Sequence, residues 1–218
     1  MIELTNAFLV VYAALFPIVN PLGSAPAFLS LTRGYSPAAR HAVSLRIAVN
    51  GFFLLLGSLL IGSHVLEFFG ITLPVVRVAG GVVVSAMGWQ LLNHGDDLEQ
   101  KVKSAVSDRQ YLRDAFYPLT MPLTVGPGSI TVAITLGSKR PTHADDFAHL
   151  ALLGGAAIAG LLAIAATIFL CYRFAENIEK LLGETGMHVF IRLSAFILLC
   201  IGIEILWSGY SELMAAAR

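Results

Sequence analysis

Two segments of this chain carry the same pattern of proline, glycine and small polar residues. FPIVNPLGSAP occupies residues 16–26 and YPLTMPLTVGP occupies residues 117–127, and each lies inside a long apolar stretch. Proline lacks a backbone N–H and clashes with the preceding helical turn, so three prolines in so short a segment predict a broken helix. A matched pair of Pro/Gly-interrupted apolar segments in two halves of a chain indicates the binding site of a transporter.

Two broken helices could bind a solute through their backbone ends. Each break leaves carbonyls and N–H groups without intrahelical partners, and these ends carry opposite partial charges that suit a zwitterion. The first halves should end near Ile18 and Leu119. The second halves should begin near Ala27 and Ser129, with Ser24 and Ser129 as caps. The predicted substrate-binding residues in the two segments are Asn20, Pro21, Gly23, Ser24, Thr124, Gly126, Gly128 and Ser129.

The breaks have a second interpretation, since proline and glycine are common in membrane spans and can simply bend helices for packing. The protein would then be a membrane-embedded scaffold or regulatory subunit with a dry, filled centre. A transporter should instead have a polar, hydrated central cavity. The residue-for-residue match between the two segments favours the transporter.

Two arginines within apolar segments are further candidates. Arg77 lies in VVRVAGG and Arg192 in FIRLSAF, at similar places in the two halves of the chain. An arginine inside a membrane span usually faces the interior or a cavity. We expect both to hold the broken segments or to bind a substrate carboxylate. The alternative is that each extends to the membrane interface with its apolar stem buried.

Glu204 is the one carboxylate that the sequence places well inside a predicted span. A carboxyl group in a low-dielectric environment titrates nearer neutral pH, so Glu204 is a candidate for proton coupling, with sodium as the other candidate ion. Trp207 and Tyr210 follow as typical interface anchors, which would place Glu204 one turn below the surface instead. The sequence has no ATP-binding loop, metal-ligand spacing or nucleophile–base set, so we expect no enzyme activity, cofactor or metal.

The elements that must position these residues are membrane-spanning helices. Hydrophobic residues form 56% of the chain and charged residues 13%, against about 25% charged in a soluble domain. Apolar runs of about 20 residues predict an all-α membrane protein. Zero net charge and the lack of a basic run argue against a nucleic-acid partner. The six predicted spans are about 5–32, 43–63, 70–92, 114–137, 147–172 and 188–210.

The spans divide into a three-helix repeat over 1–95, a polar linker over 96–112 and a second three-helix repeat over 113–218. After three crossings the second half starts from the opposite side, so we expect a 3+3 inverted-topology repeat with helices 1 and 4 broken. The bias of lysine and arginine among the loops predicts both termini on the non-cytoplasmic side. Small residues at four-residue intervals in the fifth span would also allow a homo-oligomer.

NPLGSAPAFLSLT over 20–32 and MPLTVGPGSITVAI over 121–134 resemble the MarC family of integral membrane proteins, and the resemblance covers essentially the whole chain. It implies a multipass inner-membrane secondary transporter of small neutral amino acids such as glycine and alanine, working by rocking of one repeat against the other. Met121 stands where the first copy has Asn20, so substrate contacts should be unequal. The residues that match the motif are Asn20, Pro21, Gly23, Pro26, Pro122, Gly126, Pro127 and Gly128.

Overall fold

The computed structural model describes residues 2–32, 34–93, 115–138 and 147–216, and within these ranges all regular structure is helical. The predicted linker at 96–112 lies outside them. The helices are α1 (Ile2–Val19), α2 (Pro21–Leu31), α3 (Pro37–Phe68), α4 (Leu73–Asn93), the irregular segment η2 (Ala115–Thr124), α6 (Pro127–Ser138), α7 (Phe147–Arg173) and α8 (Ala175–Ala216), which is kinked at Gly183.

Five helical segments among the described residues are long and apolar enough to cross a membrane. They comprise α1 with α2, then α3, α4, α7 and the part of α8 from Thr185 onward. The pair η2 and α6 is bent by 70° and provides a sixth span if it crosses as one unit. Each predicted apolar stretch therefore corresponds to a helical segment, and the prediction of a helical membrane protein is confirmed.

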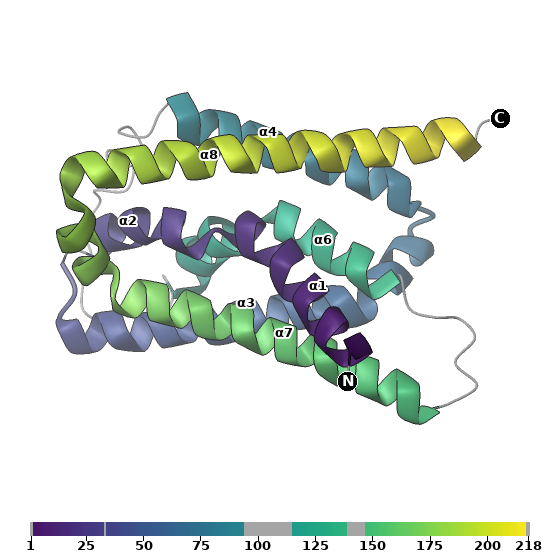
Figure 1. The fold of residues 1–218 in the computed structure, drawn as a ribbon, viewed down its shortest axis with the longest axis horizontal. Helices are drawn as coiled ribbons and strands as arrows, with labels where there is room; N and C mark the ends of the chain where they lie inside the picture. The colour runs from purple at the N-terminus through teal and green to yellow at the C-terminus, as the bar shows by residue number, and fades with distance from the viewer. Residues whose placement is uncertain (1, 33, 94–114, 139–146, 217–218) are drawn as a thin grey trace.

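The helices form three layers (Figure 1). The antiparallel pair α4 and α8 runs along one side, and α3 and α7 run along the opposite side. The two interrupted segments, α1–α2 and η2–α6, lie between these pairs. Of the described residues, the main hydrophobic core draws on the interrupted segments with α3 and α7, and from α4 and α8 it includes only Ala175. The α4–α8 pair thus lies outside this core, and it meets the other helices chiefly where α4 packs on α6 and α8 on α2.

Glycines hold α4 and α8 close together. A methyl group added at any of four glycines would strike the opposite helix, mostly its backbone, so the two helices approach as closely as glycine allows. The contacts follow one antiparallel register. Gly81 and Gly88 on α4 are seven residues apart, as are Gly202 and Gly209 on α8, and the glycines of the two helices alternate along the interface. The paired positions are Gly81 with Leu206, Ser85 with Gly202, Gly88 with Leu199, and Val78 with Gly209.

Large apolar side chains cover the outer faces of the bundle. Phe53 on α3, Leu162 on α7 and Trp207 on α8 are all more than half exposed, and many similar residues share this pattern. A soluble monomer rarely shows so much contiguous apolar surface. On these helices, it is the surface expected to face lipid.

Candidate functional site

The first break is a single residue wide and is centred on Asn20. Asn20 adopts the left-handed conformation (φ 45°, ψ 57°) between the end of α1 and the start of α2 at Pro21. A residue before proline is disfavoured in the right-handed helical region, and asparagine tolerates the left-handed one. The Asn20 side chain accepts a hydrogen bond from the backbone N–H of Gly23 at 3.1 Å, so it caps α2.

This geometry corrects two details of the first predicted break. The second half-helix begins at Pro21 rather than near Ala27, and Pro26 lies inside it. The cap is Asn20 rather than Ser24. The Ser24 hydroxyl instead donates to the backbone carbonyl of Asn20 at 2.8 Å, in the first turn of α2.

The second break is longer and comprises η2 and the bend before α6. Tyr117 and Met121 have extended backbone angles, and each precedes a proline. This is the conformation that proline imposes on its predecessor. The side chains of two threonines then take over backbone carbonyls: Thr120 donates to Ala115 at 2.6 Å and Thr124 to Leu119 at 2.7 Å. The carbonyls of this irregular segment therefore have hydrogen-bond partners within the protein, as the interior of a membrane requires.

The start of α6 also differs from the prediction. This helix begins at Pro127, two residues before the expected position, and Ser129 is fully buried within its first turn. The Ser129 hydroxyl donates to the carbonyl of Gly126 at 2.9 Å rather than capping free N–H groups. Gly126 and Gly128 are buried, and a methyl group at Gly128 would strike Val84 of α4.

Tyr172, near the end of α7, joins the two breaks. Its hydroxyl donates to Ser24 Oγ at 3.0 Å and lies 2.7 Å from Thr124 Oγ1. The side chain is fully buried, and its ring stacks on Phe28 of α2 with 4.4 Å between centroids. One hydroxyl group therefore connects the first turn of α2 to the last residue of η2, bringing together two predicted site residues that lie 100 positions apart in sequence, from 24 to 124.

The hydrogen-bond count in this cluster is uneven. Ser24, Thr124 and Tyr172 share four oxygen–oxygen contacts, two with each other and two with backbone carbonyls. Three hydroxyl groups supply three protons. One of the four contacts therefore has no proton between its two oxygens. The hydroxyl oxygens keep lone pairs that could accept hydrogen bonds from an N–H or O–H group of a ligand.

A second polar contact to the breaks comes from α3. Asn50 Nδ2 lies 3.4 Å from Thr120 Oγ1, so Asn50 bonds between helices, as its place in an apolar span predicts. Thr120, Thr124 and Ser129 are at most 2% exposed. The second break is thus filled by side chains in this conformation, whereas Asn20 and Ser24 at the first break are half-buried. A cavity of about 300 Å³ lies elsewhere, between α3 and α7.

The two candidate arginines occupy different environments. Arg77 is buried in α4, and its guanidinium pairs with the carboxylate of Glu212 near the end of α8. Arg192 is exposed on α8. Arg77 therefore ties the α4–α8 pair together in this conformation, whereas Arg192 has the exposure expected of the interfacial alternative.

Glu204 is exposed on α8. Helical geometry, with 3.6 residues per turn, places it on the face opposite Gly202 and Leu206, which pack on α4. Among the described residues, no group of three or more histidine, cysteine or acidic side chains is placed to hold a metal ion.

Nothing in the sequence singles out Tyr172. A tyrosine followed by Arg173 at the end of an apolar span is typical of an interfacial anchor. Its burial depends on α2, η2 and α7 meeting in three dimensions, which no local pattern reveals. Glu212 is likewise invisible, because it follows the predicted last span and its partner Arg77 lies 135 positions earlier.

Comparison with known proteins assigns the chain to a family. The model of the MarC family integral membrane proteins matches residues 5–214. The inner membrane protein MarC of Salmonella paratyphi A is 31% identical over 219 residues, covering 98% of each chain. The membrane protein YvbG of Bacillus subtilis is 31% identical over 209 residues, covering 91% of this chain and 92% of YvbG. No solved structure gives a significant match. The chain belongs to the MarC family of integral membrane proteins.

Proposed function

We propose that this protein is a secondary transporter of small neutral amino acids such as glycine and alanine, with its binding site between the two breaks. The observation that carries the proposal is the Tyr172 hydroxyl, buried in the protein and bonded to both Ser24 and Thr124. Buried polar groups inside a membrane protein are costly, and they commonly mark the path of a substrate.

The chemistry of the cluster fits a small zwitterion. The hydroxyls of Ser24, Thr124 and Tyr172 carry no net charge, and their oxygens could accept hydrogen bonds from an ammonium group. The N-terminal ends of α2 and α6 have the partial positive charge that suits a carboxylate. Gly126 and Gly128 permit the backbone to approach a ligand closely. Asn20, Pro21, Gly23 and Ser129 would shape the site through the backbone.

The helix packing supports a rocking mechanism. The α4–α8 pair lies outside the main hydrophobic core and meets the remaining helices chiefly through α4 on α6 and α8 on α2, so it could move as a body against them by sliding at these two contacts. The glycine contacts are symmetric between α4 and α8. When each residue is replaced by its counterpart on the other helix, the contact of Gly81 with Leu206 becomes the contact of Gly202 with Ser85. This pattern is the one that an inverted 3+3 repeat would produce. The filled centre would then belong to a closed state between two open ones.

The orientation and location follow the same proposal. The relatives from Salmonella and Escherichia coli are named inner membrane proteins, and we propose the same membrane for this chain, with both termini on the non-cytoplasmic side. Arg77 would hold α4 and α8 in register, and Arg192 would bind at the interface or meet a carboxylate in an open state. Glu204 is the candidate for proton coupling, and sodium is the alternative ion.

The second candidate function is a scaffold or regulatory subunit. The filled region between the breaks favours it, because the polar side chains there bond to one another and to backbone. On this interpretation Tyr172 would simply fasten two irregular segments together. The two functions differ in one measurable respect, which is solute exchange by the purified protein.

The test is exchange of labelled alanine and glycine against unlabelled amino acid in liposomes containing the purified chain. We expect saturable exchange, lost in Thr124→Val and retained in Thr124→Ser, because only the serine variant keeps the hydroxyl that bonds to Tyr172. Both variants must insert and remain monodisperse. No exchange by folded wild-type protein, with these and other neutral amino acids, would favour the scaffold.

A further inference from the structure

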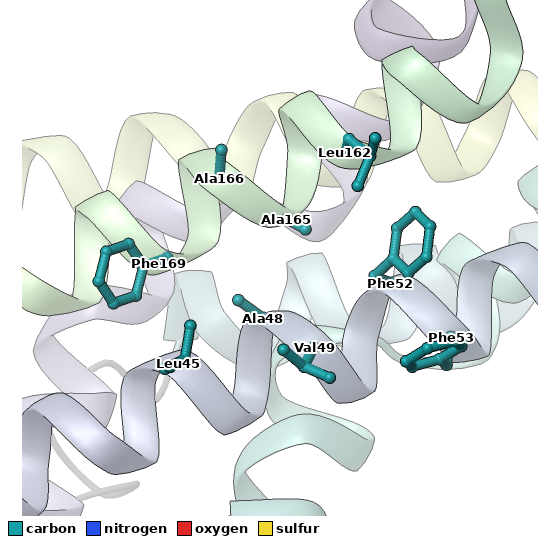
Figure 2. Close-up of a pocket in the computed structure, with 9 residues that line it drawn as sticks. All are labelled: Leu45, Ala48, Val49, Phe52, Phe53, Leu162, Ala165, Ala166 and Phe169. Carbon is teal, nitrogen blue, oxygen red and sulfur yellow. The ribbon is translucent and has the colours of Figure 1, made fainter. Parts of the chain in front are cut away.

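An apolar groove lies between α3 and α7, on the outer face of the bundle (Figure 2). Its volume is about 300 Å³. The aromatic side chains Phe52, Phe53 and Phe169 border it, and the small side chains Ala48 and Ala165 lie between the two helices. All the lining side chains are apolar. The groove therefore fits a hydrocarbon chain rather than a polar solute.

The groove opens toward the bilayer. Phe53 is 63% exposed and Leu45 is 48% exposed, while Ala48 at its base is buried. From Leu45 to Phe53 the helical rise covers about 12 Å. A lipid in the surrounding membrane can enter from the side without crossing any polar surface.

One end of the groove is basic. On α7, Arg173 follows Phe169 by four residues and so continues the stripe that lines the groove. On α3, His41 precedes Leu45 by four residues, and its ring meets the edge of Phe169 with 5.5 Å between centroids. Arg46 is exposed on the outer side of the same end of α3. Two arginines and a histidine therefore lie near this end of the groove, and the Arg173 guanidinium sits over the ring of Phe174, 5.8 Å from its centroid.

Two nearby acidic residues, Glu176 and Glu179, do not cancel this charge. Glu176, at the start of α8, is paired with Arg40, and Arg40 also donates to the carbonyl of Thr32 at 3.1 Å. Glu179 and Lys180 are both exposed on α8 and their charges offset each other, so Arg173 and Arg46 remain in excess at this end. The bias of lysine and arginine places the same end at the cytoplasmic surface, where anionic lipid headgroups gather.

We propose that this groove binds one anionic phospholipid, with an acyl chain between α3 and α7 and its phosphate at Arg46, Arg173 and His41. Basic pockets between membrane helices on the cytoplasmic side are suited to anionic headgroups. A second copy of the chain fits less well, because helix interfaces in membranes favour small residues that let backbones approach. Here the outer edge of the groove is formed by phenylalanines.

Native mass spectrometry of the purified full chain tests this, with phosphatidylglycerol and phosphatidylcholine carrying identical acyl chains. We expect one phosphatidylglycerol to be retained per chain and phosphatidylcholine to be lost. Arg173→Gln should weaken retention of phosphatidylglycerol about fivefold, and Arg46→Gln with Arg173→Gln about 25-fold. Lys180→Gln is the matched control, since it removes one exposed positive charge at the same end of the protein.

A second pair of variants tests the acyl-chain site without changing charge. Ala166→Trp places a bulky side chain in the groove and should abolish retention, whereas Ala86→Trp adds the same bulk to an exposed position of α4 and should not. Equal retention of the two lipids would overturn the proposal. So would equal effects of Arg173→Gln and Lys180→Gln, or a dimer that Ala166→Trp dissociates while lipid retention is unchanged.

Discussion

Replacing Tyr172 by phenylalanine isolates the hydroxyl that joins the two breaks. The ring and its stacking on Phe28 remain, while the bonds to Ser24 at 3.0 Å and Thr124 at 2.7 Å are lost. Both partners keep their bonds to backbone carbonyls, so no buried hydroxyl proton is left without an acceptor. Because Tyr172 supplies one proton for its two contacts, the loss should be the net value of about one hydrogen bond, about 1 kcal/mol.

Such a loss lowers the unfolding midpoint by about 2–4 °C for a chain of this size. Thermal unfolding in detergent measures it. A double-mutant cycle with Ser24→Ala should give a coupling energy of about 0.6 kcal/mol. Ser24→Ala is a clean partner because the Asn20 carbonyl still accepts the backbone N–H of residue 24 at 3.0 Å. In Tyr172→Phe we also expect alanine exchange to fall at least tenfold, since a substrate would lose its direct contact with the Tyr172 hydroxyl.

Tyr12→Phe is the matched control. Tyr12 also bonds to α7, through Thr167 at 3.1 Å, but it lies on α1, two turns before the break. It should show a similar change in unfolding midpoint and leave alanine exchange within about twofold. If Tyr12→Phe and Tyr172→Phe reduce exchange equally, the Tyr172 hydroxyl is only a structural bond. A coupling energy near zero between Ser24 and Tyr172 would refute the hydrogen-bonded network itself.

Three further predictions test other features. Glu212→Gln should lower the free energy of unfolding by about 1–2 kcal/mol, which is less than for a fully buried ion pair because Glu212 is 45% exposed. Adding Arg77→Gln should recover part of the loss in unfolding midpoint. A further loss would contradict the pairing. Gly88→Leu should disrupt α4–α8 packing and reduce the yield of folded protein, whereas Gly154→Leu, whose added side chain meets open space, should not; equal yields would count against the close packing. Glu204→Gln should leave alanine exchange unchanged when no gradient is applied, because exchange does not require the coupling group to release its proton. The same variant should lose the stimulation of transport by a proton gradient. Persistent stimulation would exclude Glu204 as the coupling site.

The sequence alone determined the features that depend on local covalent chemistry and on composition. Long apolar stretches with few charges must form helices in a membrane, since every backbone polar group needs an internal partner. Prolines also limit where a helix can continue. Pro21 stands at the start of α2 and Pro118 and Pro122 lie in the irregular segment η2, whereas α1 continues through Pro17.

Tertiary structure decided which groups meet at those interruptions. Asn20 became the cap of α2 because the break is one residue wide, and Ser24 was thereby free to bond to Tyr172. Arg77 and Arg192 looked equivalent in sequence, yet Arg77 is buried against Glu212 and Arg192 is exposed. These outcomes depend on which helix faces pack together, which is set by contacts between residues more than 100 positions apart in the chain. Periodicity and composition report on one segment at a time, and so they carry no record of such contacts.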